Sequence, residues 1–539
     1  MADLATLTPH LPTVAVRTHP VLRARTSRRG WAVFLVALSL GLAYIAVHVS
    51  RDLEGTKGAA SWPFVLLGTA LLIALGFEFV NGFHDTANAV ATVIYTNALE
   101  PQVAVVWSGL CNLCGVLVST GTVAYAIVAL LPVDLILQIS SHAGFAMVFA
   151  LLIAAILWNL GTWWLGLPAS SSHTLVGSIV GVGIANQLLN AQSGASGVDW
   201  EQGRKVLEAL LISPLIGFAL AGLLLLISKR LFKFADLYKA PAGNQPPPLP
   251  IRALLVLTCT GVSFYHGSND GQKGMGLIML ILIGTVPTAY ALNHSLGPAE
   301  IQTFIVASEQ ASHVLSRHID PAAPVAANPQ AEITAYIRTR KLEPATIPAL
   351  RSLVDNIDRE VIQYHGYKAV PAEDQGNVRN NMYVASEALR LMKKTNTPAF
   401  TSAEWSALSN YKSRVDKSIK YIPDWVKVAV ALALGLGTMV GWKRIVITVG
   451  EKIGKEHLSY AQGASAELVA AATIFVADQF GLPVSTTHIL SSGVAGTMAA
   501  NGSGLRMRTV RNIAAGWVFT MPAAALLSAL LYLAFRQIP

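Results

Sequence analysis

The chain has 539 residues, of which 53% are hydrophobic and only 13% are charged, and its formal net charge is +9. A soluble domain carries close to twice this share of charged residues, so the composition excludes an ordinary soluble protein. The basic residues gather in short clusters beside apolar segments, as at 23–29 and 229–233. This is the pattern of cytoplasmic loops in a membrane protein and not of a nucleic-acid-binding surface.

Apolar segments recur along the chain at lengths of about 18–25 residues, which suffice to cross a ~30 Å hydrocarbon layer. The short ones flank two pairs of polar motifs and are expected to form half-helices or re-entrant hairpins. The sequence therefore predicts an all-α polytopic membrane protein with its N-terminus in the cytoplasm. About twelve transmembrane or re-entrant segments are expected near 31–49, 62–82, 103–131, 143–166, 173–189, 206–228, 251–266, 274–293, 424–449, 464–480, 486–500 and 512–535.

Polar segments divide these spans into two repeats, and in transporters with paired repeats the second copy is commonly inverted. We therefore expect inverted repeats. The insertion in the second repeat shows helical periodicity and contains no catalytic constellation. The predicted parts are a cytoplasmic basic tail (1–30), an extra first span with its loop (31–61), the first transmembrane repeat (62–230), a Pro-rich linker (231–250), the first part of the second repeat (251–293), a soluble helical insertion (294–422) and the second part of the second repeat (423–539).

The first polar motif occurs once in each half, as Val-Asn-Gly-Phe-His-Asp-Thr-Ala-Asn at 80–88 and Tyr-His-Gly-Ser-Asn-Asp-Gly-Gln-Lys at 265–273. Asp85 and Asp270 are expected at the ends of apolar segments. A carboxylate inside a bilayer is costly unless it is paired, so each is a candidate functional residue. The alternative is that each carboxylate only caps a broken helix.

The second motif is Gly-Leu-Pro-Ala-Ser-Ser-Ser-His at 166–173 and Gly-Leu-Pro-Val-Ser-Thr-Thr-His at 481–488. Proline ends the incoming helix and suits the first turn of the next one. Hydroxyl groups, free backbone N–H groups and the positive end of a helix dipole then converge, which predicts a site for a tetrahedral oxyanion. The alternative is an ordinary Ser/Thr helix cap.

Carboxylates repel an oxyanion, so the two motifs can share a cavity only if a cation joins them or the acids are protonated. This combination predicts a symporter. Asn88 of the first copy corresponds to Lys273 of the second, and an ammonium group can replace a bound monovalent cation. His84 and His266, beside the acids, can titrate near neutral pH, unless each only donates to a backbone carbonyl. These features favour protons over Na⁺ as the coupling ion.

The four motifs, in this order, resemble those of the inorganic phosphate transporter (PiT) family, and the stretches 80–96 and 266–280 resemble its bacterial low-affinity branch. The resemblance implies that phosphate contacts the hydroxyl residues of the second motif. It also implies that residues of the first motif hold the cation or proton, with Asp85 and Asp270 as metal ligands. The implied phosphate-binding residues are Ser170, Ser171, Ser172, Ser485, Thr486 and Thr487. The implied coupling residues are Asp85, Asn88, Asn269 and Asp270. The reasoning from the residues adds His84, His266 and Lys273 to this set, and His84 and Lys273 differ from the Asn that is commoner in the family.

The same resemblance implies an inverted-repeat homodimer in the bacterial inner membrane that imports phosphate by alternating access. Its symported ion would be H⁺, with phosphate carried as a complex with a divalent metal such as Mg²⁺ and with Na⁺ less favoured. Arsenate would act as an analogue of phosphate, and no resident cofactor or nucleic acid is expected. Two rival hypotheses are a membrane hydrolase using Ser171 with His173, or Thr486 with His488, and a transporter of sulfate or free divalent metal.

Overall fold

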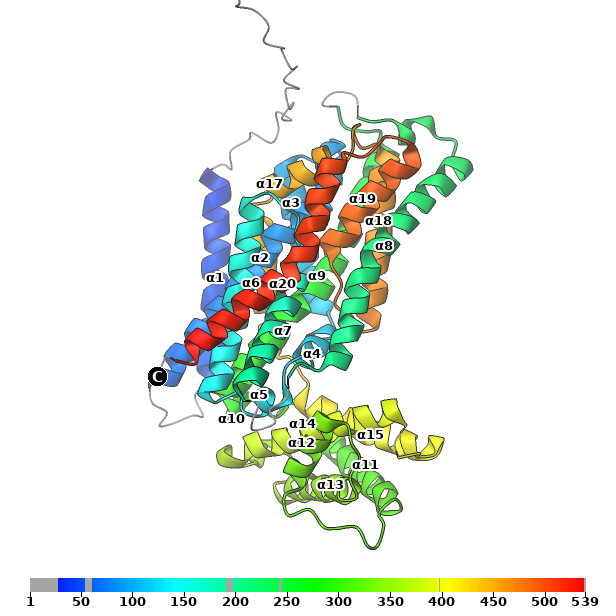
Figure 1. Cartoon of the computed structure of the whole chain (residues 1–539). Coiled ribbons are helices and arrows are strands. Elements are labelled where there is room, and N and C mark those ends of the chain that lie inside the picture. Colours follow the sequence, from blue (N-terminus) through cyan, green and yellow to red (C-terminus); the bar gives the residue numbers. More distant parts are fainter. Residues whose placement is uncertain (1–27, 54–60, 191–196, 242–244, 397, 538–539) are drawn as a thin grey trace, which may run out of the picture.

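The computed structural model describes residues 28–53, 61–190, 197–241, 245–396 and 398–537, and within these ranges the side chains at 29, 61–64, 86–88 and 451 are not described. The described residues form helices without any named β-strand, as predicted (Figure 1). The helices of the bundle are α1 (Arg28–Leu53), α2 (Ser61–Tyr95), α3 (Pro101–Val118), α4 (Thr122–Val128), α5 (Val133–Leu137), α6 (His142–Trp164), α7 (Ser171–Leu189), α8 (Trp200–Leu231), α9 (Leu249–Thr285), α10 (Pro287–Tyr290), α16 (Asp424–Thr438), α17 (Lys443–Ile447), α18 (Tyr460–Gln479), α19 (Thr486–Asn501) and α20 (Met507–Phe535).

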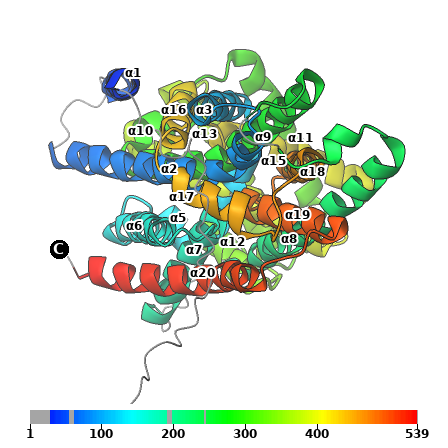
Figure 2. The ribbon, with the colours of Figure 1, turned by 90° about the horizontal axis from the view of Figure 1, so that it is seen from above.

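Within the described ranges, eight helices are long and apolar enough to cross a membrane: α1, α2, α3, α6, α8, α9, α18 and α20. A ninth span forms if α16 and α17, which are bent by 55° at the break between them, are taken together. Two of the predicted segments, 251–266 and 274–293, belong to the single helix α9. The other predicted segments correspond to these spans, to α7 and to α19. Figure 2 shows α1 at the rim of the bundle, where it packs against α16 on the outside of the other helices.

The first motif does not break its helix, and this part of the prediction is wrong. Helix α2 runs without interruption through Asp85, and α9 runs through Asp270. Both carboxylates therefore lie inside helices and not at the ends of segments. A helix already satisfies its own backbone groups, so it needs no break to present a polar side chain to the bundle interior.

Corresponding helices of the two halves run in opposite directions. Arg252, in the first turn of α9, donates through Nε to the carbonyl of Ala98, just beyond α2, at 2.8 Å. Helix α9 thus starts where α2 ends. Helix α7 runs from the middle of the bundle toward the start of α8, whereas α19 runs the other way and ends where Asn501 accepts a hydrogen bond from Lys229 near the end of α8 (Figure 1). This is the arrangement that inverted repeats require.

Each half also packs on the other in a reciprocal manner. Helix α8 of the first half packs against α19 of the second, and α20 of the second packs against α7 of the first. Glycines allow this approach: a Cβ atom on Gly181 would lie 2.0 Å from the carbonyl oxygen of Ala525, and one on Gly496 would lie 2.0 Å from that of Phe218. Small residues at such crossings let helix backbones approach closely inside a membrane.

The polar insertion forms a helical subdomain at one end of the bundle (Figure 1). Apolar side chains of the insertion join the hydrophobic core of the bundle. Polar contacts add to this packing, since Arg379 and Asn380 donate to the carbonyls of Ile136 and Leu137 at the end of α5. The helices of this subdomain are α11 (Pro298–Ser316), α12 (Pro329–Thr339), α13 (Thr346–Gln363), α14 (Ala372–Thr395) and α15 (Ser402–Ile419).

A second polar contact joins the insertion to the start of α8. Arg340 and Arg390 each approach the Oδ2 atom of Asp199, at 3.1 and 3.0 Å. Burial opposes ionisation of Asp199, but the backbone N–H of Gln202 and the two guanidinium groups together hold the pKa of its carboxyl below the usual value. Charged contacts around a carboxylate that stays ionised at neutral pH therefore add to the apolar packing between the subdomain and the bundle.

The close helix contacts at Gly181 and Gly496 give a test of the fold. Gly181→Ala and Gly496→Ala should each lower the midpoint of thermal unfolding in detergent, because the new methyl group must push two helices apart at a cost of about 1–3 kcal/mol. Gly68→Ala in α2 is the matched control, since no atom lies within 4 Å of its added Cβ. Equal midpoints for all three variants would contradict the packing described.

Candidate functional site

The second motif builds two helix N-termini in the same way. Gly166 and Gly481 adopt the left-handed backbone conformation, with φ of +67° and +63°, just after α6 and α18 end. A proline follows each, and then a serine caps the next helix: Ser170 accepts from the N–H of His173 and Ser485 from the N–H of His488, both at 3.2 Å. The helix-cap alternative thus describes these two serines correctly.

The hydroxyl groups after these caps meet at one carboxylate. Ser171 donates to Asp85 Oδ2 at 2.6 Å and Thr487 donates to Asp85 Oδ1 at 2.7 Å. Ser172 donates to the carbonyl of Val484 at 2.8 Å, directly before the second helix. The hydroxyl of Thr486 is buried and has no hydrogen-bond partner among the side chains that the structure describes. The two N-termini, from opposite halves of the chain, therefore lie side by side.

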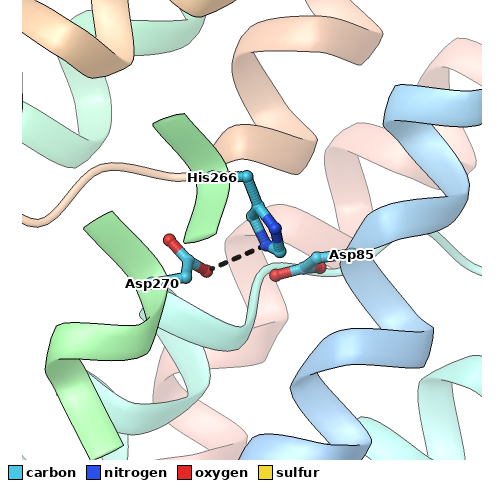
Figure 3. A group of neighbouring side chains, drawn as sticks. All are labelled: Asp85, His266 and Asp270. Carbon is cyan, nitrogen blue, oxygen red and sulfur yellow. Dashed lines mark ion pairs between the residues drawn. The ribbon is translucent and has the colours of Figure 1, made fainter. Parts of the chain in front are cut away.

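The two acids of the first motif lie beside these N-termini and form a group that could hold a metal ion. One ligand atom each of Asp85, His266 and Asp270 lies within 4.8 Å of the others, and all three residues are buried (Figure 3). His266 Nε2 is 3.6 Å from Asp270 Oδ2. Carboxylate oxygens and an imidazole nitrogen suit a divalent cation of intermediate hardness, and the carboxylates also suit Mg²⁺.

Lys273 lies inside this cluster with no exposed surface. Its Nζ atom donates to Asp270 Oδ1 at 2.6 Å, to the hydroxyl of Ser172 and to the carbonyl of Val484 at 3.4 Å. A carboxylate, a hydroxyl and a backbone carbonyl are also the ligands of a bound alkali cation. The ammonium group thus occupies a ring of oxygen atoms of that kind and neutralises one of the two acids.

The remaining predicted residues have different surroundings. Asn269 holds the segment before α19, since its amide donates to the carbonyl of Leu482 at 3.1 Å. His84 bonds to Asp85 at 3.1 Å and to Thr162 of α6 at 3.2 Å. Both motif histidines contact side chains, which argues against the alternative that they only donate to backbone carbonyls. The side chain of Asn88 lies outside the described residues.

Several polar residues that the sequence analysis did not select lie around the site. Asn112 of α3 bonds to His266 Nδ1 at 2.9 Å and donates to Thr438 of α16 at 3.2 Å. Glu78 of α2 is fully buried two turns before Asp85. Glu78 and Asn112 could have been selected from the sequence, because each is a polar residue within an apolar segment. Polar residues inside a membrane are commonly functional.

The geometry does not support a hydrolase. Ser171 donates to a carboxylate, while the ring of His173 lies 3.0 Å from the capping hydroxyl of Ser170. His488 stacks on Trp517 with ring centroids 4.1 Å apart. The proposed nucleophiles are therefore not paired with the proposed bases, which nucleophilic catalysis requires. Two positive helix ends beside acids and an ammonium group instead suit an oxyanion accompanied by a cation.

Comparison with known proteins agrees with this chemistry. Residues 81–528 match the model of the Phosphate transporter family, PHO4. "Low-affinity inorganic phosphate transporter PitA" of Escherichia coli K12 is 42% identical over 486 residues, covering 87% of this chain and 96% of PitA. PitB of the same strain is 41% identical over 483 residues, with the same coverage of each chain. A solved structure, "The sodium-dependent phosphate transporter", is 18% identical with a TM-score of 0.47 and covers 88% of this chain and all of that one. From the extent of the family match and these identities, the chain belongs to the phosphate transporter family, which is a family of transporters and not of enzymes.

Proposed function

We propose that this protein imports inorganic phosphate across the bacterial inner membrane by proton symport, through alternating access. The observation that carries the proposal is the meeting of two helix N-termini from opposite halves beside Asp85 and Asp270. Such a site, buried between half-helices that run in opposite directions, is typical of secondary transporters.

Phosphate binds where the two N-termini converge. Helix geometry leaves the first N–H groups of α7 and α19 without acceptors in their own helices. The hydroxyls of Ser171 and Thr487 now donate to Asp85, and that of Thr486 has no partner. All three can turn toward an oxyanion, which would receive hydroxyl and amide donors together with the positive ends of two helix dipoles.

A cation separates phosphate from the acids. Asp85 and Asp270 with His266 would hold a divalent metal such as Mg²⁺ that enters bound to phosphate, since these ligand atoms converge within 4.8 Å. The metal is then part of the cargo. A neutral metal–phosphate complex moving with one proton carries one positive charge inward, so the membrane potential would add about 2.3 kcal/mol per 100 mV to uptake.

Protons are favoured over Na⁺ because Lys273 fills the position that a monovalent cation would occupy. Its Nζ atom already bonds to a carboxylate, a hydroxyl and a carbonyl. An ammonium group tethered to α9 neutralises Asp270 without being released, so a bound Na⁺ is not needed there. Sulfate is a poorer cargo than phosphate, because it carries no proton to donate to a carboxylate, whereas arsenate should be transported as an analogue.

The direction of insertion follows from the distribution of charge. Figure 1 shows the end of α8 and the starts of α9 and α20 at the end of the bundle opposite the insertion. The sequence places clusters of basic residues at these helix ends, and such clusters face the cytoplasm. They include Lys229, Arg230, Arg252, Lys452, Lys455, Arg506, Arg508 and Arg511. The N-terminus then lies in the cytoplasm and the helical insertion on the outer side. We propose a homodimer by the family resemblance alone.

The first prediction concerns the acids. Asp85→Asn and Asp270→Asn should each reduce proton-driven uptake of labelled phosphate into proteoliposomes by roughly ten- to a hundredfold, since a hydrogen bond to a charged group contributes about 1.5–3 kcal/mol. Asp236→Asn is the control, because that side chain is exposed and pairs with Lys239, which is also exposed. Normal proton-driven uptake by both site variants would end the proposal that these acids couple transport.

The second prediction concerns Lys273. Lys273→Asn removes the tethered ammonium group and leaves its three oxygen partners in place, so uptake by this variant should become stimulated by Na⁺. Uptake is measured with Na⁺, H⁺ and Mg²⁺ varied independently, and Lys239→Asn serves as the exposed control. If Lys273→Asn transports phosphate with an unchanged ion requirement, the ammonium group does not replace a cation.

A further inference from the structure

Glu78 is a third buried carboxyl beside the site, and no step of the proposed mechanism uses it. It lies on the same face of α2 as Asn81 and Asp85, which follow it by three and seven residues. Its carboxyl rests directly against α9 at Gly274, where an added Cβ would lie 2.2 Å from Glu78 Oε1. The glycine next to Lys273 thus makes room for this carboxyl.

The surroundings of Glu78 favour a neutral carboxylic acid in this conformation. The side chain has no exposed surface, and neither oxygen atom has a hydrogen bond of normal geometry. The nearest donors are the amide of Asn81 and the backbone N–H of Gly274. An ionised carboxylate without donors is far more costly inside a membrane protein than a protonated one.

The charged groups that act on Glu78 are Asp270 and Lys273, both on α9. Lys273 is next to Gly274, against which the Glu78 carboxyl rests, and it is itself bonded to Ser172, one of the hydroxyl residues at the anion site. The ammonium group of Lys273 therefore lies between Glu78 and the anion site in the order of contacts.

We propose that Glu78 carries the proton that is symported with phosphate, an inference that rests on the proposed function. A proton from water on the outer side forms an O–H bond with the Glu78 carboxylate. The same bond breaks when water reaches Glu78 from the cytoplasmic side, and the proton passes to that water. At each step one O–H bond breaks as another forms: a hydronium ion gives up the proton on the outer side, and a water molecule accepts it as hydronium on the cytoplasmic side.

The sign of the coupling follows from charge. Phosphate at the helix N-termini adds negative charge near Glu78 and attracts Lys273, which removes the positive charge that would stabilise an ionised Glu78. Bound phosphate therefore increases the proton affinity of Glu78. Coupling is reciprocal, so a protonated Glu78 increases the phosphate affinity by the same factor, typically about 5- to 150-fold. Proton and phosphate then bind and leave together, as symport requires.

Glu467 of α18 is a matched comparison. It is also fully buried within the bundle, but its Oε2 atom accepts a hydrogen bond from Thr258 at 2.6 Å. Thr258 precedes Asp270 by twelve residues on α9, which places it about 18 Å along the helix at 1.5 Å per residue, on the other side of the acids from Gly274. Glu467 is thus a membrane carboxyl without the connection to Lys273.

The test uses Glu78→Gln and Glu467→Gln in the full-length protein, reconstituted in proteoliposomes. Glutamine has the shape of a protonated glutamate, so both variants should fold. Two quantities are measured with labelled phosphate: accumulation driven by an imposed proton gradient between pH 6 and pH 8, and exchange of internal for external phosphate without a gradient. Exchange requires phosphate binding and alternating access but no net proton movement.

We expect Glu78→Gln to lose gradient-driven accumulation by at least about tenfold and to lose its dependence on pH, while exchange stays within about threefold of wild type. Glu467→Gln should keep both activities. Gradient-driven accumulation by Glu78→Gln at the wild-type level would overturn this proposal alone, and so would loss of coupling in both variants or loss of exchange by Glu78→Gln. Wild-type uptake that ignores the proton gradient would overturn proton symport itself and this proposal with it.

Discussion

Two helix N-termini that end inside the bundle are the constraint on which the rest of this structure depends. Unpaired N–H groups and positive dipole ends are unfavourable in an apolar interior unless something negative or polar compensates them. Here Ser170 and Ser485 cap the helices, and Asp85 receives hydroxyls from both. The acid occupies the positive region to which we assign phosphate.

The position of Asp85 in the region assigned to phosphate links the two motifs physically. A carboxylate that stabilises the N-termini must be released from them when an oxyanion binds, and it then needs a cation of its own. Asp270 already has one in Lys273, whereas Asp85 has His84 and, across the site, His266. Under the proposed function, a metal ion that arrives with phosphate would supply the missing charge. Anion binding would then depend on a cation.

The sequence predicted correctly those features that depend on the local chemistry of the backbone. A Gly-Leu-Pro phrase before hydroxyl residues predicted a helix end and a new helix start, and both copies do this at Gly166 and Gly481. The meeting of hydroxyls and acids was also predicted. The helix break predicted at the first motif does not occur in α2 or α9. The polar residues and glycines inside these helices face other helices and leave the helical hydrogen bonds intact. The contact of Glu78 with Gly274, and that of Asn112 with His266, join distant segments and leave no pattern in a single sequence.

Equilibrium binding of labelled phosphate to the purified protein, without any ion gradient, tests the central claim most directly. Wild type should bind phosphate more tightly when Mg²⁺ is present. Ser171→Ala combined with Thr486→Ala removes one hydroxyl from each N-terminus and should weaken binding by roughly 30- to 150-fold, at about 1–1.5 kcal/mol for each hydrogen bond. Unchanged phosphate affinity in the double variant would show that the two N-termini do not form the phosphate site.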